Sequence, residues 1–446
     1  MKTLHPPACA GIRPGMTLIE MLVATAATLM LMGAIAQVFS VFGSAVSNSR
    51  SMIELDGRIR TVSWRLREDL AGATARTVPP LEPQAGEGYF EAIEGPARDS
   101  DAAHGTTALA ADIDDVLLFT TRSLTTPFTG KAGNNSVESS VAEVAWFLRP
   151  TAGTAAPTTY TLFRRQLLVI GYAGFPPFST SGNTIPATSW GAFYDQYDVS
   201  ARMDGGFITP NTLSDLTRRE SRFFHWHRED TNGNGSLDLG EDTNGNGLLD
   251  PIFPYVFPAK TSYQAANAPN GLIFASSRAG EDVVLTNVIA FDVRVFDPAV
   301  PIGVSGNDAV VPGDPGYAAG TANGGYVDLG HGETLPGASG IEPHFSTQGR
   351  GNYREQIYGM AGSRTWDTWS THYENNGMDE DNVAGPDQGA DGLDSNANGE
   401  VDEPAEFETS PPYPYPLRGI EVRIRCYEPS SRQVRQVTVR HTFVPH

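Results

Sequence analysis

Near its start the chain reads Gly15-Met16-Thr17-Leu18-Ile19-Glu20, and an apolar run from Met21 to about Val46 follows directly. About 20 apolar residues span a bilayer, so the run is long enough for a transmembrane helix. Glu20 stands at the mouth of that helix, and a carboxylate in lipid is costly unless it has a partner. A cut after Gly15 would create such a partner, the α-amino group of Met16.

This order of residues resembles the leader and N-terminal signature of type IV pilins and pseudopilins. The resemblance implies that a prepilin peptidase cuts after Gly15 and methylates the new N-terminus at Met16. It also implies that Glu20 pairs with the N-terminal amine of a neighbouring subunit in a helical filament. Mature pilins usually begin with Phe, so Met16 is a departure from the family pattern.

Two simpler readings compete with this one. In a secretory signal, Lys2 and Arg13 would form the basic region and Ala34-Ile35-Ala36 the cleavage site. Glu20 argues against it, because such a signal does not place an acid directly before its apolar region. A plain signal anchor would explain the length of the run but not the residue order before it.

Composition sets further limits. The 446 residues suffice for a sizeable core, and the formal charge of −21 makes the chain a poor nucleic-acid binder. So acidic a chain suits an extracytoplasmic surface or divalent cations. Cys9 would leave with the leader, so Cys426 would stand alone and no intrachain disulfide is expected.

The apolar run passes into an amphipathic helix. Its stripe consists of Leu55, Ile59, Val62, Leu66 and Leu70. Intervals of three and four residues put these side chains on one helix face. We therefore expect one helix from Met16 to about Ala71, roughly 80 Å long at 1.5 Å per residue. Gly72 and then Pro79-Pro80 should end it.

The remainder reads as short strands separated by long loops. Strands are expected at 116–119, 144–148, 160–169 and 283–296, with a C-terminal hairpin from 420–426 and 437–443 that has one wet face. Residues 301–352 read as loop. The predicted fold class is α+β: a pilin-like long N-terminal transmembrane helix packed on an antiparallel β-sheet domain with long loop insertions.

The predicted organisation has three parts. These are a leader at 1–15, the long helix at 16–72 with 16–46 in the membrane or filament core, and a β-rich domain at 73–446 with insertions at about 170–280 and 300–410. The strand motifs at 115–119, 143–148, 162–165, 285–291, 366–369 and 416–422 are similar to those of J-type minor pseudopilins of type II secretion. The insertions depart from a compact J-type domain.

Residues 230–241 read DTNGNGSLDLGE and fit a calcium-binding loop throughout. The expected oxygen donors are Asp230, Asn232, Asn234, Ser236, Asp238 and Glu241. The pattern repeats directly afterwards without its twelfth position, with donors Asp242, Asn244, Asn246 and Asp250. A flexible Asn/Gly-rich linker is the alternative.

A second acidic stretch carries the same nine-position pattern. Its candidate donors are Asp394, Asn396, Asn398 and Asp402. The twelfth position is Ala405, so Glu403 or Glu406 would have to replace it. Calcium is the expected cofactor here too, with a solvated acidic loop as the alternative.

We find no motif for catalysis, and the chain is not expected to be an enzyme. His225-Trp226-His227 could offer two imidazoles to a metal, but no third ligand is evident. Trp366 and Trp369 are expected in the core.

The sequence thus predicts a minor pseudopilin in the tip complex of a type II secretion pseudopilus. Prepilin peptidase, other pseudopilins or minor pilins and the inner membrane are the expected partners, with a single pass and the C-terminal domain in the periplasm. A minor pilin of a type IV pilus, or a calcium-dependent surface adhesin exported by a pilin route, stays open.

Overall fold

The computed structural model describes residues 15–95, 112–151, 159–171, 193–194, 196–204, 207–223, 227–228, 251–252, 279–332, 343–347, 364–379 and 385–443. The chain forms two compact units. One holds the residues up to Gly57 together with Glu428–Arg432. The other holds Arg58–Tyr427 and the segment from Gln433 onward.

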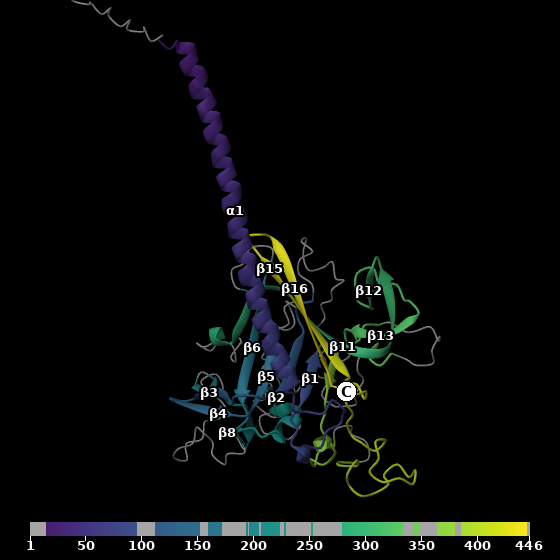
Figure 1. Ribbon diagram of the computed structural model, residues 1–446. Helices are drawn as coiled ribbons and strands as arrows, with labels where there is room; N and C mark the ends of the chain where they lie inside the picture. The colour runs from purple at the N-terminus through teal and green to yellow at the C-terminus, as the bar shows by residue number, and fades with distance from the viewer. Residues whose placement is uncertain are drawn as a thin grey trace, which may run out of the picture. The chain divides into compact units, whose positions relative to one another are not determined.

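A single helix, α1 (Leu18–Ala71), opens the described chain and runs without a break for 54 residues (Figure 1). The predicted helix is confirmed, with its first helical residue two positions later than Met16. The five residues of the predicted stripe are all buried: Leu55, Ile59, Val62, Leu66 and Leu70. Burying one such aliphatic side chain stabilises a fold by about 1.5–3 kcal/mol, so the stripe holds the second half of the helix in place.

The last turn of α1 is tied to the sheet through Asp69. The indole Nε1 of Trp146 and the guanidinium of Arg164 both donate to its carboxylate, and the hydroxyl of Thr121 donates to its backbone carbonyl at 2.7 Å. Gly72 then ends the helix where the chain passes close to the carbonyl oxygen of Arg122. The predicted end of the helix is therefore confirmed.

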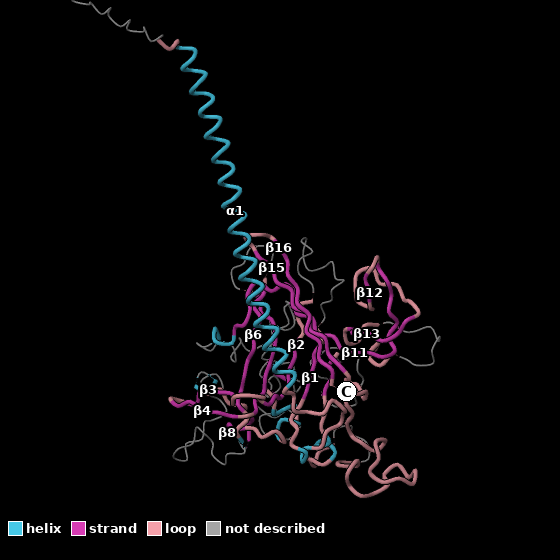
Figure 2. The backbone as a smooth tube through the Cα atoms, in the orientation of Figure 1, coloured by secondary structure: helices cyan, strands magenta, loops and turns pink. Residues whose placement is uncertain are grey.

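The main sheet has ten strands among the described residues, and Figure 2 shows them in magenta. Its path runs β14-β1-β2-β5-β6-β11-β15-β16, with β12 and β13 paired to β11. The bounds are β1 Phe90–Ile93, β2 Val116–Arg122, β5 Val141–Pro150, β6 Tyr160–Leu168, β11 Val283–Ser305, β12 Asp308–Val310, β13 Ala322–Val327, β14 Thr365–Asp367, β15 Gly419–Glu428 and β16 Gln433–Thr442. The pairs from β14 through β15 are antiparallel. The α+β class is thus confirmed.

Smaller elements complete the described part. Two-stranded pairs are formed by β3 (Phe128–Ala132) with β4 (Asn135–Ser139), β7 (Ala201–Asp204) with β8 (Phe207–Pro210), and β9 (His227–Arg228) with β10 (Pro251–Ile252). Short 3-10 helices are η1 Pro83–Ala85, η4 Asp215–Thr217, η5 Arg219–Ser221, η6 Ala279–Asp282 and η8 Thr371–Glu374.

The predicted strands correspond to β2, β5, β6, β11, β15 and β16, but two expectations were wrong. Residues 301–352 are not all loop: β11 continues to Ser305, and both β12 and β13 pair with it. The C-terminal hairpin does not have a uniformly wet face either. Glu421 is buried, because Arg423 and Arg440 both donate to its carboxylate.

Aromatic side chains fill much of the core. Phe147 on β5 stacks on Phe163 of β6, with 5.6 Å between ring centroids. Trp366 and Trp369 are buried as predicted, and each indole N–H donates to a group beside it, the carbonyl of Tyr415 and the hydroxyl of Thr409. Cys426 is a free, buried thiol on β15.

Candidate functional site

The N-terminal candidate residues surround the start of α1. Gly15, Met16 and Thr17 precede the helix, and Glu20 lies in its first turn. The backbone N–H and the hydroxyl of Thr17 both donate to Glu20 Oε2 at 3.0 Å. The N–H of Glu20 donates back to the Thr17 hydroxyl at 3.3 Å. This reciprocal pattern is a capping box, which satisfies N–H groups that have no partner inside the helix.

The capping box gives Glu20 a local structural role that the sequence analysis did not foresee. Both Thr17 hydrogen bonds end on Oε2, and no hydrogen bond to Oε1 occurs among the described residues. One carboxylate oxygen therefore remains available to a further donor while the cap is intact.

The first half of α1 presents apolar side chains outward. Leu18, Met30 and Phe39 are 84%, 77% and 72% exposed, and the apolar surface continues to Val46. By length and composition this helix could cross a membrane, and none of its most apolar window is buried. A signal sequence would pass the same test, so the finding supports an N-terminal apolar helix that could span a membrane and no particular membrane.

The Asp394 loop is described, and backbone N–H groups within it donate to three of its four candidate donors. Asp394 accepts from the N–H groups of Asn398 at 3.0 Å and Gly399 at 2.8 Å. Asn396 and Asn398 each accept from the N–H two residues further on. Gly399 has φ of 96°, a left-handed conformation that glycine adopts without strain. Local hydrogen bonds therefore hold this loop in a turn, and its role as a calcium-binding loop stays a prediction.

Glu403 joins this loop, whereas Asp402 is engaged elsewhere. Both side-chain amides, of Asn396 and Asn398, donate to Glu403 Oε1 at 2.6 Å. The hydrogen bond from Asn396 is the main reason why the pKa of Glu403 is lowered. Glu406 accepts from the N–H of Asn396 at 3.0 Å, while Asp402 accepts from the N–H of Gly392 at 2.9 Å. Carboxylate and amide oxygens are ligand types that calcium binds, and calcium at this loop stays a prediction.

The tandem loops lie outside the described residues. This applies to Asp230, Asn232, Asn234, Ser236, Asp238, Glu241, Asp242, Asn244, Asn246 and Asp250, and also to His225 and Trp226. Calcium at these positions stays a prediction.

Sequence reasoning missed a group of buried carboxylates. Glu94, Asp112 and Asp328 place oxygen atoms within 4.8 Å of one another, and Asp112 does the same with Asp114 and Asp115. A signal was present in Asp112-Ile113-Asp114-Asp115, where three acids precede the apolar strand β2. Nothing in the local sequence indicates that Glu94 and Asp328 join them.

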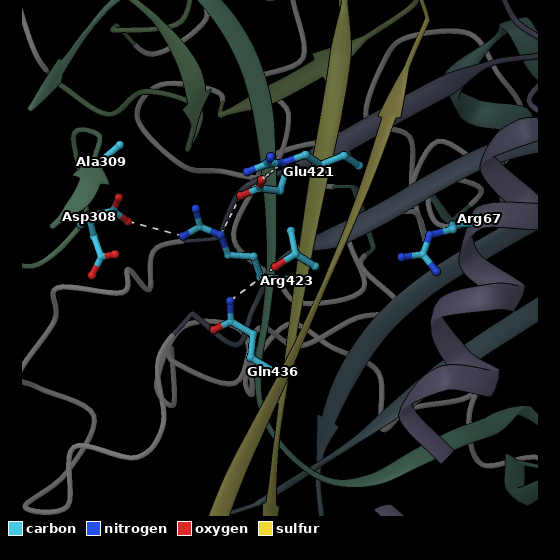
Figure 3. Close-up of a pocket in the computed structure, with 9 residues that line it drawn as sticks. Arg67, Asp308, Ala309, Glu421, Arg423 and Gln436 are labelled. Carbon is cyan, nitrogen blue, oxygen red and sulfur yellow. Dashed lines mark hydrogen bonds and ion pairs between the residues drawn. The ribbon is translucent and has the colours of Figure 1, made fainter. Parts of the chain in front are cut away.

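Charged side chains also line a pocket of about 820 Å3 beside the C-terminal hairpin (Figure 3). Arg67, Asp308, Glu421, Arg423 and Gln436 are among its lining residues. The guanidinium of Arg423 donates to Glu421 at 2.7 Å, so charges of both signs already neutralise one another there. The pocket presents no pair of carboxylates set apart as acid and base, and the expectation that the chain is not an enzyme stays a prediction.

Neither a protein-family model nor a curated protein nor a solved structure matches this chain.

Proposed function

We propose that this chain is a pilin-like filament subunit, most like a J-type minor pseudopilin of a type II secretion system, held in the inner membrane with its β-rich domain in the periplasm. The observation that carries the proposal is the first half of α1. Its apolar side chains are exposed, and Glu20 is the only charged residue between Met16 and Val46. Exposed apolar surface of this extent requires lipid or other helices around it.

Glu20 would supply the specificity of assembly. Replacing lipid by a neighbouring apolar helix brings little hydrophobic gain, because lipid tails are as apolar as leucine. The free energy of the Glu20 carboxylate would differ strongly between the two environments, because only the filament offers it the amine of another subunit. Glu20 Oε1 could accept from that amine without breaking the Thr17 cap, which uses Oε2.

The second half of α1 would transmit the position of the filament core to the β-rich domain. Leu66 and Leu70 are fully buried, and Asp69 is bound by groups of β2, β5 and β6. These contacts would keep the last turns of α1 attached to the sheet within the β-rich domain.

Calcium is part of the proposal. Asp394, Asn396 and Asn398 would hold the ion in the described loop, with Glu403 beside them. A bound cation would neutralise charge in an exposed acidic segment and fix its conformation.

Glu20 has two competing roles, the cap and the assembly contact, and a pair of variants separates them. Glu20→Gln keeps an oxygen that can cap the helix but removes the charge. Thr17→Val removes the hydroxyl of the cap, at a cost of about 0.5–2 kcal/mol in helix stability, but keeps the carboxylate. Each full-length variant is crosslinked in membranes to co-expressed pilin-like subunits.

The proposal predicts a several-fold loss of crosslinked product for Glu20→Gln and little loss for Thr17→Val, with equal amounts of both variants in the membrane. The reverse pattern, normal crosslinking of Glu20→Gln and loss with Thr17→Val, would show that Glu20 only caps the helix.

A further inference from the structure

Three segments that are distant in sequence meet at one end of the sheet. Glu94 follows β1 directly, Asp112 stands a few residues before β2, and Asp328 follows β13 directly. Strands β1 and β2 are antiparallel neighbours with Ile93 opposite Val116, so the residues just beyond this pair lie at the same end of the sheet. β11 joins them, because the N–H of Phe291 donates to the carbonyl of Asp112 at 2.9 Å.

Several other buried acids of this molecule have donors. Asp115 accepts from the backbone N–H groups of Gly95 at 3.0 Å and Val293 at 2.7 Å. Further away, Arg222 lies 3.0 Å from Glu91 and 2.9 Å from Asp367. The fold thus satisfies these buried carboxylates with N–H groups or with arginine, as buried charges require.

Glu94 and Asp112 differ from these acids. Their side chains are buried, at 2% and 1% exposure, and none of their four carboxylate oxygens has a hydrogen-bond partner among the described residues. Instead, one oxygen of Glu94, one of Asp112 and one of Asp328 lie within 4.8 Å of one another. Burying two carboxylates without hydrogen-bond donors is strongly unfavourable, unless a group other than the donors of this protein neutralises their charge.

The surrounding charges make ionised Glu94 and Asp112 still less favourable. The acids gathered here are Glu94, Asp112, Asp114, Asp115, Asp292 and Asp328. Arg294 is shared by three acids, Asp292 at 3.0 Å, Asp314 at 2.8 Å and Asp328 at 3.1 Å. Burial, and after it the charge of Asp115, raise the pKa of both Glu94 and Asp112 well above the usual range.

We propose that Glu94, Asp112 and Asp328 form a buried site for a divalent cation, and that the cation is calcium. All the donors are carboxylate oxygens, the ligands that hard cations prefer. Magnesium keeps several of its waters and demands octahedral geometry, whereas calcium accepts six to eight oxygens in flexible geometry. A site made of buried carboxylates from three segments therefore suits calcium better.

The site would act as a staple for the sheet. The cation would link the residue after β1, the segment before β2 and the residue after β13. The last of these is far from the other two in sequence. It is separate from the loops at 230–250 and 394–402 and from the filament contact at Glu20, so it does not depend on the proposed function.

The experiment uses the full chain in detergent, with Asp230→Ala and Asp394→Ala as a background that weakens the two loop sites. Asp112→Asn is compared in this background with Glu138→Gln, an equally conservative change at an exposed acid on β4. Bound calcium is counted after equilibrium dialysis. Thermal unfolding is then recorded in calcium and in chelator.

The background chain and the Glu138→Gln control should bind one calcium ion more than Asp112→Asn. Calcium at a hundredfold excess over Kd should lower their unfolding equilibrium constant about a hundredfold. Asp112→Asn should lose that response, yet in chelator it should be at least as stable as the background, because the amide removes a source of repulsion. Magnesium should stabilise less than calcium.

The proposal is overturned if the background chain binds no calcium, or if Asp112→Asn keeps both the ion and the stabilisation. An equal response to magnesium would overturn the assignment of calcium. If Asp112→Asn does not fold, Glu94→Gln takes its place in the same two measurements.

Discussion

The guanidinium of Arg164 on β6 donates two hydrogen bonds to the carboxylate of Asp69 in the last turn of α1. Nε lies 2.7 Å from Oδ2 and Nη2 lies 2.8 Å from Oδ1, so the pair is bidentate. Both side chains are more than nine-tenths buried. The indole of Trp146 donates to the same carboxylate at 3.1 Å. This contact fixes where the long helix ends on the sheet.

Removing one partner of this pair should destabilise the domain. Arg164→Ala leaves Asp69 buried with only weaker partners, and such losses cost about 3–5 kcal/mol. Arg65→Ala is the control: Arg65 is one-third exposed and 3.7 Å from Asp69, so its removal should cost no more than about 1 kcal/mol. Denaturant unfolding of the full chain in detergent measures both. Equal losses for the two variants would contradict the role given to Arg164.

A methyl group at Gly72 should disturb the same junction. A Cβ there would lie 2.2 Å from the carbonyl oxygen of Arg122, which is backbone and cannot swing away. We expect Gly72→Ala to cost about 1–3 kcal/mol, as overpacking does. Gly57→Ala is a matched change within α1 where a Cβ meets nothing within 4 Å, and it should be neutral or stabilising by up to about 1 kcal/mol. Similar melting temperatures for both variants would count against this helix end.

The thiol of Cys426 should be inert in the folded chain. Burial raises its pKa to about 12, so it stays protonated at neutral pH and does not react with alkylating reagents. A raised folded-state pKa favours the folded state below pH 9 and loses that contribution as pH rises towards 12, by up to about 1.4 kcal/mol per pH unit. Thiol titration with and without denaturant tests this, and fast labelling of the native chain would contradict it.

The sequence was sufficient for features that depend on neighbours along the chain. The spacing of Leu55, Ile59, Val62, Leu66 and Leu70 predicts a buried helix face, and all five are buried. Apolar runs likewise located β2, β5 and β6. In both cases the periodicity of one segment decides its structure, and the final packing agrees with the local preference.

Features built from distant segments could not be predicted in this way. β12 and β13 lie in a stretch rich in Gly and Pro, and they become strands because the long strand β11 offers its edge. Glu421 alternates like a surface residue, but two arginines allow its burial. Glu94 and Asp328 are more than 200 residues apart, so only the fold brings them together with Asp112.

The central claim is that α1 is a processed filament helix, and the N-terminus of the mature chain tests it most directly. The full-length protein is expressed with a prepilin peptidase, extracted from membranes and measured by mass spectrometry. We expect a chain that begins at Met16 with a methylated amine and that titrates one thiol in denaturant, since Cys9 leaves with the leader. A chain that begins at Gln37, or that keeps residues 1–15, would contradict the account.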